Sequence, residues 1–447
     1  MTDVPRLTIH EIRLAERVVS MRLPFRFGSA EVRHTCEIYC QMVAEMDGRT
    51  VQGVSAQLMV PRWFDKRDAL TNEDTVQELR DSTKAAVTVA TGLSGTVATL
   101  SEEIGWKTPA RLPADLPALA AGFGPALIEM ALIDALCRGA GLPFHKAARA
   151  DLFGLAAHLP PDVPAADFIK ALTRIGAPGR VTIRHTVGFD APVSTRPHDA
   201  PRDGLPVTLS EVIAATGISA WKIKLKGDPD TDAARLLTLQ ETLGGLMNGG
   251  VTLDANEQYA PDAFRAFLRR LKQPDLATIA ARIRFFEQPF AREIALQTRN
   301  DFGVPLLIDE SDDDLSSFAT ALKLGWSGTS IKSCKGVLRA LVNMARAQRA
   351  GAVLSGEDLT CQPGLCWTQD TAMAAACGVI DLERNGHHFA GGLQGASTLE
   401  REQMVAQFPQ MFTAVGDRVD LVITNGMVDV TGLSAPGFGA SSAILAN

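Results

Sequence analysis

Eight short apolar runs recur between residues 181 and 383, and segments of helix length separate them. Strands that are apolar throughout and alternate with helices indicate a parallel sheet covered on its outer face. Eight such units predict an α/β fold of the (β/α)₈-barrel type. The runs are VTIRHTVG (181–188), ISAWKIKLK (218–226), VTLDANE (251–257), IRFFEQP (283–289), VPLLIDE (304–310), GTSIKSC (328–334), GAVLSGE (351–357) and GVIDLE (378–383).

A doubly wound sheet is the structural alternative, but it usually has fewer units and a glycine-rich first turn. Neither the G-x-G-x-x-G pattern nor the G-x-x-x-x-G-K-[ST] pattern occurs in the sequence. We therefore do not expect a nucleotide-binding loop of either kind.

The first 150 residues have a different pattern, which predicts a separate α+β domain. Two apolar stretches, 37–46 and 51–60, flank the turn signal Asp47-Gly48. Helical periodicity follows at 72–91 and at 124–138. The barrel domain is then assigned to residues 151–400.

The tail, residues 401–447, is predicted to return to the N-terminal domain. Within it, residues 418–440 have the pattern of a strand, an Asn425-Gly426 turn and a second strand. Strands that follow a complete barrel most simply pair outside it. We therefore expect a discontinuous first domain.

Composition excludes several classes of function. Lysine and arginine total 44, aspartate and glutamate total 51, and the net charge is −7, which makes nucleic-acid binding improbable. The most apolar stretch, 118–141, contains Glu129, Asp134 and Arg138, which argues against a membrane span. The N-terminus has no apolar signal core and the seven cysteines form no C-x-x-C pair, so we expect a cytoplasmic protein with reduced thiols.

Charged side chains stand at the ends of five consecutive predicted strands, where barrel enzymes hold their catalytic groups. A single charge of this kind is most often a solvated strand end. Five in succession, with both signs, indicate a buried site whose charges are paired or bind a metal ion. The residues are Lys222 and Lys224 on strand two, Asp254 on strand three, Glu287 on strand four, Asp309 on strand five and Lys332 on strand six.

The three carboxylates lie on neighbouring strands and are hard oxygen ligands, which suit Mg²⁺, with Mn²⁺ as an alternative, rather than Zn²⁺. Lys224 and Lys332 belong to opposite sides of the ring, with the carboxylates between them. Two such amines can remove a proton from one face of a substrate and deliver one to the other. Crowding of Lys222 near Lys224, together with the metal charge, is expected to disfavour the charged form of either amine and so to lower its pKa toward a useful range.

Five motifs at these strand ends occur in order and at barrel spacing, and together they resemble the signature of the enolase superfamily, within its muconate-lactonizing-enzyme-like subgroup (mandelate racemase/muconate lactonizing enzyme family). The resemblance covers most of the chain. It implies a (β/α)₈-type barrel with an α+β capping domain that the C-terminal tail completes. The motifs are Lys222-Ile-Lys224, Leu253-Asp254-Ala255-Asn256, Phe286-Glu287-Gln288-Pro289, Ile308-Asp309-Glu310-Ser311 and Ile331-Lys332-Ser333-Cys334-Lys335-Gly336.

The resemblance also implies a set of residue roles. One essential Mg²⁺ would be held by the carboxylates of Asp254, Glu287 and Asp309. A proton α to a carboxylate would be abstracted to give an enediolate, with Lys224 and Lys332 as the bases. Lys222 would tune Lys224 electrostatically, and Asn256 and Glu310 would orient the ligands from behind. Family resemblance further suggests a homo-oligomer.

Departures from the family pattern bear on the substrate rather than on the metal or the bases. The paired glycines after strand six are reduced to Gly336, and the segment that begins at Ser355 is not the usual short loop after strand seven. Extra sequence also stands at 150–215.

A few residues are candidates for substrate contact. In the loop 24–34, Arg26 could meet a second anionic group, although a solvated arginine is the simpler alternative. Asp381 and Glu383 at strand eight resemble the acidic pair with which dipeptide epimerases hold a substrate ammonium. His387 and His388 follow them, and a surface position is again the alternative.

The sequence therefore supports a Mg²⁺-dependent racemase or epimerase that acts on an amino acid derivative, a dipeptide or a related carboxylate. A dehydratase or cycloisomerase, a lyase that uses the same enolisation half-reaction, is the alternative. A non-catalytic ligand-binding relative is disfavoured, because buried charges without a function are costly to keep. In each case the expected partner is a small carboxylate, not a nucleic acid or a membrane.

Overall fold

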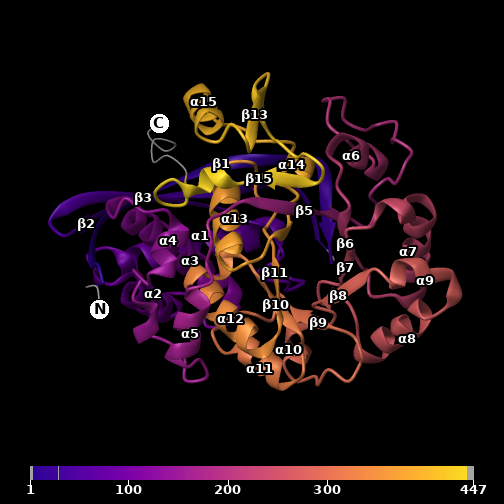
Figure 1. Ribbon diagram of the computed structural model, residues 1–447, viewed down its shortest axis with the longest axis horizontal. Helices are drawn as coiled ribbons and strands as arrows, with labels where there is room; N and C mark the ends of the chain where they lie inside the picture. Colours follow the sequence, from indigo (N-terminus) through magenta and orange to yellow (C-terminus); the bar gives the residue numbers. More distant parts are fainter. Residues whose placement is uncertain (1–3, 29, 440–447) are drawn as a thin grey trace.

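A closed barrel of eight parallel strands forms the centre of the computed structural model, which describes residues 4–28 and 30–439 (Figure 1). Each strand pairs with the next along the chain, and the last pairs back onto the first to close the ring. The predicted barrel is confirmed, and every predicted strand is present. The strands are β5 (Arg180–Val187), β6 (Ala220–Lys224), β7 (Val251–Asp254), β8 (Ile283–Glu287), β9 (Leu306–Ile308), β10 (Gly328–Ile331), β11 (Val353–Gly356) and β12 (Asp381–Glu383).

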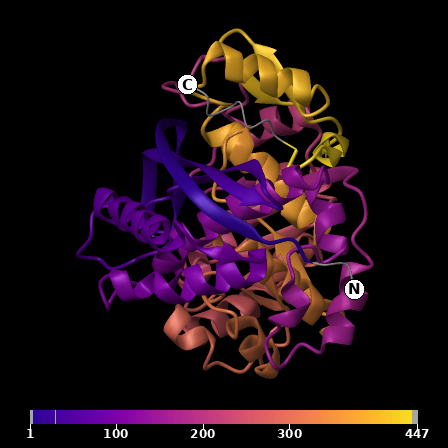
Figure 2. The ribbon, with the colours of Figure 1, turned by 90° about the vertical axis from the view of Figure 1, so that its left-hand side faces the viewer.

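The N-terminal domain, indigo and violet in Figures 1 and 2, lies beside the barrel and combines an antiparallel sheet with helices. Asp47 and Gly48 both have positive φ and join β2 to β3, so the predicted hairpin turn is confirmed. The strands are β1 (Leu7–Phe27), β2 (Ala30–Met46), β3 (Arg49–Leu58) and β4 (Ser94–Gly95). The helices are α1 (Asn72–Ala90), α2 (Val97–Lys107), α3 (Ala118–Gly139) and α4 (Phe144–Arg149).

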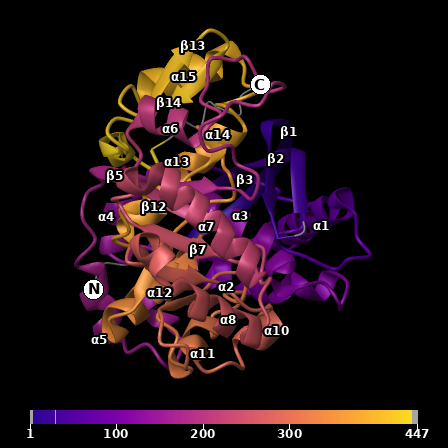
Figure 3. The same ribbon diagram turned by 90° about the vertical axis from the view of Figure 1, so that its right-hand side faces the viewer.

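Helices cover the outside of the barrel, and Figure 3 shows α7 and α8 on the side that faces the viewer. In α8, Phe264, Phe267, Leu268 and Leu271 are buried, and this spacing places them on one face of the helix. The helices between α4 and the C-terminal segment are α5 (Ala165–Leu172), α6 (Leu209–Thr216), α7 (Pro229–Leu243), α8 (Pro261–Leu271), α9 (Ala277–Ala280), α10 (Arg292–Ala295), α11 (Ser317–Lys323), α12 (Val337–Ala350), α13 (Leu365–Ala376) and α14 (Gly386–Phe389).

Helix α3 joins the two domains. It is long and apolar enough to cross a membrane by composition, but it is mostly buried inside the protein as a core helix. Its Glu129 accepts hydrogen bonds from the backbone N–H groups of Val337 and Leu338, at the start of barrel helix α12. Its Asp134 accepts from the N–H groups of Val54 at 2.9 Å and of Phe438 at 3.0 Å. One helix thus fixes the N-terminal sheet, the barrel and the C-terminal return together.

The C-terminal segment departs from the prediction. The Asn425-Gly426 turn is present, but the two strands around it do not pair as a hairpin: β14 (Arg418–Leu421) pairs with β13 (Phe412–Val415), and β15 (Met427–Asp429) pairs with barrel strand β5. Helix α15 (Thr398–Gln407) precedes them. Gly437 then reaches the N-terminal half through a bridge to Pro143. Residues 440–447 of the predicted return lie outside the described residues.

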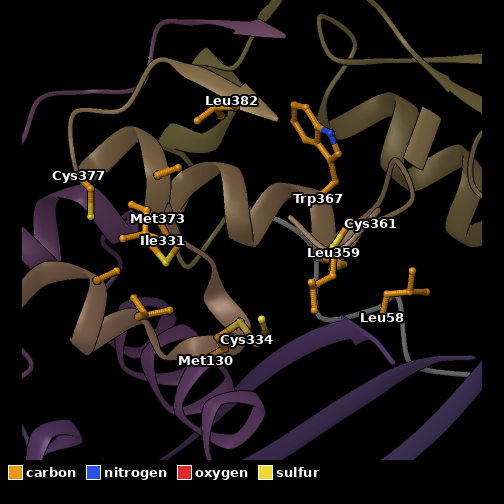
Figure 4. Close-up of a cluster of buried hydrophobic side chains, with 14 of the residues drawn as sticks. Leu58, Met130, Ile331, Cys334, Leu359, Cys361, Trp367, Met373, Cys377 and Leu382 are labelled. Carbon is orange, nitrogen blue, oxygen red and sulfur yellow. A yellow bond between two sulfur atoms is a disulfide. The ribbon is translucent and has the colours of Figure 1, made fainter. Parts of the chain in front are cut away.

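A cluster of buried apolar side chains fills the space between barrel strands β10 to β12, helix α13 and the N-terminal domain (Figure 4). Met130 of α3 and Leu58 of β3 lie in the same view as Ile331 and Leu382 of the barrel. Cys361 and Cys366 belong to this cluster and form a disulfide, with Cα atoms 5.8 Å apart. The expectation of reduced thiols is therefore wrong for this pair, because the loop after strand seven folds back on itself.

Candidate active site

A small buried cavity lies at the carboxyl ends of the barrel strands, and the N-terminal domain covers it. This position is where barrel enzymes place their catalytic groups. The barrel supplies Lys222, Lys224, Asn256, Asp309, Lys332, Glu357, Asp358, Leu359, Thr360 and Glu383 to its lining, and the N-terminal domain supplies Phe25, Phe27, Val60 and Trp63. Charged groups from the barrel therefore face an apolar ceiling from the other domain.

Lys222 lies at the centre of the charged groups. Its Nζ is 2.8 to 3.1 Å from four carboxylates, those of Asp254, Glu287, Glu357 and Glu383. Burial opposes the charged ammonium, but these carboxylates outweigh burial and raise the pKa of Lys222 well above its ordinary value. Crowding by Lys224 alone therefore does not lower the pKa of Lys222, because Glu357 and Glu383 also contact its ammonium and the prediction counted neither of them as its partner.

The two predicted bases stand at the ends of strands on opposite sides of the ring. Lys224 follows Lys222 by two residues on β6, and its Nζ contacts Asp254 at 2.5 Å and Asn256 at 2.8 Å. Lys332 follows β10, and its Nζ contacts Asp309 and lies 2.9 Å from Glu357. The ring of Trp63 lies 5.1 Å from the Lys332 ammonium. Both amines reach the cavity, each held by a different carboxylate.

The buried acids form a suitable set of ligands for a hard divalent cation. Carboxylate oxygens of Glu287, Asp309 and Glu357 lie within 4.8 Å of one another, as one of the groups in the described residues that could hold a metal ion. Asp254 faces the same volume through its shared contact with Lys222. The positively charged Nζ of Lys222 already lies among these carboxylates. The residues therefore fit the Mg²⁺ that the sequence predicts.

The charge of the acids depends strongly on their neighbours. Burial opposes the charged form of Asp309, but Lys332 and Lys335 outweigh it and hold its pKa below the ordinary value. Burial and the negative charge of Glu357 raise the pKa of Glu287 well above its ordinary value. Burial and nearby negative charge thus both oppose the charged form of Glu287, and a cation bound at this place would favour it.

Asn256 lines the cavity, and Glu310 lies behind it in contact with its side-chain amide. The Asn256 amide donates to Glu310 at 3.1 Å, and its carbonyl oxygen accepts from Lys224. Lys66, from the N-terminal domain, donates to Glu310 at 2.8 Å. These contacts join the barrel site to the covering domain, and they fix the orientation of the side chains that reach the cavity.

Several charged residues of the site were not predicted, among them Asp358, Glu357, Lys335 and Arg184. The last three make further contacts. Glu357 lies at the end of β11, Lys335 donates to Asp309 at 2.9 Å, and Arg184 on β5 donates to Ser355 at 2.6 Å. All three are buried. The signal was present for Glu357 and Lys335, because both are charges beside a predicted strand end, the same pattern that identified the others.

The predicted substrate contacts are only partly brought together. Glu383 lines the cavity, whereas Asp381 pairs with Arg184 and Arg284 and lines a different pocket. Arg26 pairs with Glu31 and Asp190 beside another pocket, and its neighbours in sequence, Phe25 and Phe27, line the cavity instead. The structure therefore does not bring Asp381 and Arg26 to the cavity that holds the two lysines.

His387 and His388, also candidates for substrate contact, lie with His185 in a separate cluster, in which His185 and His388 are buried and His387 is half-buried. The rings of His185 and His388 lie 4.7 Å apart. Burial, with the nearby His387, lowers the pKa of His185 to about 3, and burial lowers that of His387 to about 4. For His388, burial, the two other histidines and Arg22 lower the pKa well below its ordinary value. All three imidazoles are therefore neutral at neutral pH.

This cluster predicts that acid destabilises the protein. The native state keeps His185 neutral, whereas the unfolded chain binds a proton below its ordinary pKa of about 6.5, so stability falls as pH drops from about 6.5 toward about 3. We expect the free energy of unfolding of His185→Leu to depend less on pH than that of the wild type, by about 2 kcal/mol near about pH 5. Urea unfolding at several pH values measures this, with the exposed His198→Leu as control. Parallel pH profiles for wild type and His185→Leu would contradict the prediction.

A comparison with family models matches residues 207–442 to a model described as enolase C-terminal domain-like. No functionally curated protein matches the sequence.

Solved structures of similar fold cover nearly the whole chain. A mandelate racemase/muconate lactonizing protein from Herpetosiphon aurantiacus is 18% identical, with a TM-score of 0.64, over 97% of this chain and 98% of its own. A muconate lactonizing enzyme from Pseudomonas fluorescens, complexed with muconolactone, is 16% identical, with a TM-score of 0.63, over 97% and 96%. A dipeptide epimerase from Cytophaga hutchinsonii, complexed with Mg and the dipeptide D-Ala-L-Val, is 14% identical, with a TM-score of 0.62, over 97% and 96%. At these identities the likeness shows the shared fold.

Proposed function

Because this chain belongs to the enolase superfamily, with more than half of its length matched by the enolase C-terminal domain-like model, we propose that it is a racemase or epimerase that requires Mg²⁺. The proposed reaction removes the proton α to a carboxylate and passes through an enediolate. One observation carries the proposal: two buried lysines, Lys224 and Lys332, reach one cavity from opposite sides, with carboxylates between them.

The lysines exchange the proton. With the substrate between them, one amine takes the α-proton from one face, and the other ammonium delivers a proton to the opposite face. Inversion therefore needs one lysine neutral and the other charged at the start of each turnover. The roles reverse for the opposite enantiomer, so the same pair supports both directions.

The metal would be held by Asp254, Glu287 and Asp309, which are buried oxygen donors at neighbouring strand ends. A bound Mg²⁺ would stabilise the negative charge that develops on the substrate carboxylate. Asn256 and Glu310 hold the surrounding side chains from behind. The apolar ceiling reduces contact with water, which strengthens the electrostatic interactions below it.

The substrate we propose is an amino acid derivative, a dipeptide or a related small carboxylate. Phe25, Phe27 and Trp63 offer apolar contact above the reacting carbon. Glu383 at the cavity wall is an acceptor for a substrate ammonium, and it currently accepts from Lys222 at 2.8 Å. The likeness in fold to a dipeptide epimerase supports this choice. A cycloisomerase or dehydratase would use the same proton abstraction and differ in its product.

The test is α-proton exchange in D₂O, followed by NMR. The protein is incubated with Mg²⁺ and pools of N-acetyl amino acids, dipeptides and sugar acids, with EDTA as the control. Loss of an α-proton signal that requires Mg²⁺, together with the opposite stereoisomer at unchanged mass, supports the proposal. Loss of water or ring closure would instead identify the lyase. Exchange that persists in EDTA would contradict the metal requirement.

A further inference from the structure

The geometry points to Glu357 as the positioning residue for Lys332, and so for one of the two bases rather than for both. This inference rests on the proposed two-lysine reaction and deepens it. Glu357 follows strand seven, outside the strands that carry the predicted ligands and bases. Its carboxylate is buried and lines the cavity.

Both oxygens of Glu357 are engaged, which fixes the plane of the carboxylate. Its Oε2 accepts from Lys332 at 2.9 Å and from Lys222 at 2.8 Å. Its Oε1 accepts from the Ser355 hydroxyl at 2.7 Å and lies 3.4 Å from a guanidinium nitrogen of Arg184. Because Ser355, on the strand that precedes Glu357, holds Oε1 in place, Oε2 can hold the Lys332 ammonium in a fixed position.

The second base has different partners. The hydrogen bonds of Lys224 in the described residues go to Asp254 and Asn256, on the next strand of the barrel. Glu357 reaches Lys222 and Lys332 instead. A change at Glu357 therefore alters the surroundings of one base directly and leaves the contacts of the other in place.

Lys332 needs this partner because its other acid is shared. Asp309 accepts from Lys332, Lys335 and Ser330, and it belongs to the proposed ligand set. An oxygen that binds a cation is a weaker acceptor for an ammonium. Glu357 lies close enough to Glu287 and Asp309 to reach the same cation, but the proposed ligand set uses Asp254 instead, which leaves Glu357 as the carboxylate that orients Lys332. The lysine side chain is flexible, and misplacement of a reacting group by about 1 Å costs about 10²-fold in rate.

The first experiment needs no substrate and uses Mg²⁺ alone. Crystal structures of the full chain with Mg²⁺ are compared for the wild type and Glu357→Gln. We expect Lys332 Nζ to stay within hydrogen-bond distance of Glu357 in the wild type and to move in the variant, with Lys224 in place in both. Mg²⁺ bound directly to Glu357, or an unmoved Lys332 in the variant, would overturn the inference.

The second experiment compares the two faces of the substrate. The rate of α-proton exchange in D₂O is measured for each enantiomer of the compounds that the wild type accepts. The enantiomer that Lys332→Ala no longer exchanges is the one whose proton Lys332 removes. Glu357→Gln is expected to slow exchange from that enantiomer by about 10²-fold and to leave exchange from the other within a factor of about two. Ser355→Ala, which loosens Glu357 without removing a charge, is expected to shift the same ratio in the same direction by a smaller factor.

Glu383→Gln is the matched control. Glu383 is also buried and also accepts a hydrogen bond from Lys222, but it contacts neither Lys224 nor Lys332. We expect Glu383→Gln to slow both enantiomers equally. Equal slowing by Glu357→Gln would overturn the inference, since that is the result of a merely structural role. Failure of the proposed function looks different: no compound would exchange with the wild type, while the Mg²⁺ structures would still show whether Glu357 positions Lys332.

Discussion

Replacement of either Lys224 or Lys332 by alanine is expected to abolish racemisation, while each variant keeps α-proton exchange from a single enantiomer. A positioned acid or base contributes about 10²–10⁴-fold to a proton transfer, and inversion needs two of them in one turnover. The loss in kcat should therefore be at least this large. The remaining lysine can still remove and return a proton on its own face.

Exchange of each enantiomer in D₂O, measured separately, checks this prediction. Lys226→Ala is the matched control, because Lys226 follows the same strand but is exposed and lies near the ring of Phe189. Its racemisation rate should equal that of the wild type. Normal turnover by Lys224→Ala or by Lys332→Ala would remove that lysine from the mechanism. Loss of exchange from both enantiomers in one variant would show that a single lysine serves both faces.

The barrel could be predicted because its strands are buried on both faces. Such strands are continuous apolar runs, and the segments between them are long enough for one helix each. The C-terminal hairpin could not be predicted in the same way. Strand β14 had two possible partners, β13 before it and β15 after it, and local patterning does not decide between them. Packing of β15 on β5, a contact between distant parts of the sequence, decided the pairing.

Site residues could be predicted where a charged residue stands at a strand end. The prediction failed where the outcome depended on a residue's position along its strand or on the side to which its side chain points. Asp381 and Glu383 share a face of β12, but two residues along a strand are about 6.6 Å apart, so only Glu383 reaches the cavity. Arg26 was predicted to lie in a covering loop, but it is part of strand β1. Side chains alternate along a strand, so its neighbours Phe25 and Phe27 point to the cavity and Arg26 points elsewhere. The residues of the apolar ceiling, such as Phe25 and Phe27, could not be predicted as site residues, because they are uncharged and the prediction relied on charged residues at strand ends.

Lys222→Met is expected to have the largest effect on stability. The Lys222 ammonium lies within 3.1 Å of four buried carboxylates, and methionine keeps the length of the side chain but removes the charge. Removing one partner from a buried ionic cluster leaves the others uncompensated, which costs about 3–5 kcal/mol. In EDTA, the free energy of unfolding should fall by about this amount, whereas the exposed Lys226→Met should change it little.

Mg²⁺ should restore much of that loss, because a divalent cation bound by the same carboxylates replaces the missing positive charge. A ligand that binds only the folded state stabilises it according to its concentration and affinity, and the affinity for Mg²⁺ should rise when a competing ammonium is removed. Urea unfolding in EDTA and in excess Mg²⁺ therefore gives a larger stabilisation by Mg²⁺ for Lys222→Met than for the wild type. A variant that folds only with Mg²⁺ would be the same result in stronger form. Equal stabilisation of both proteins would show that Mg²⁺ and the Lys222 ammonium do not share the carboxylates, and the proposed ligand set would then be wrong.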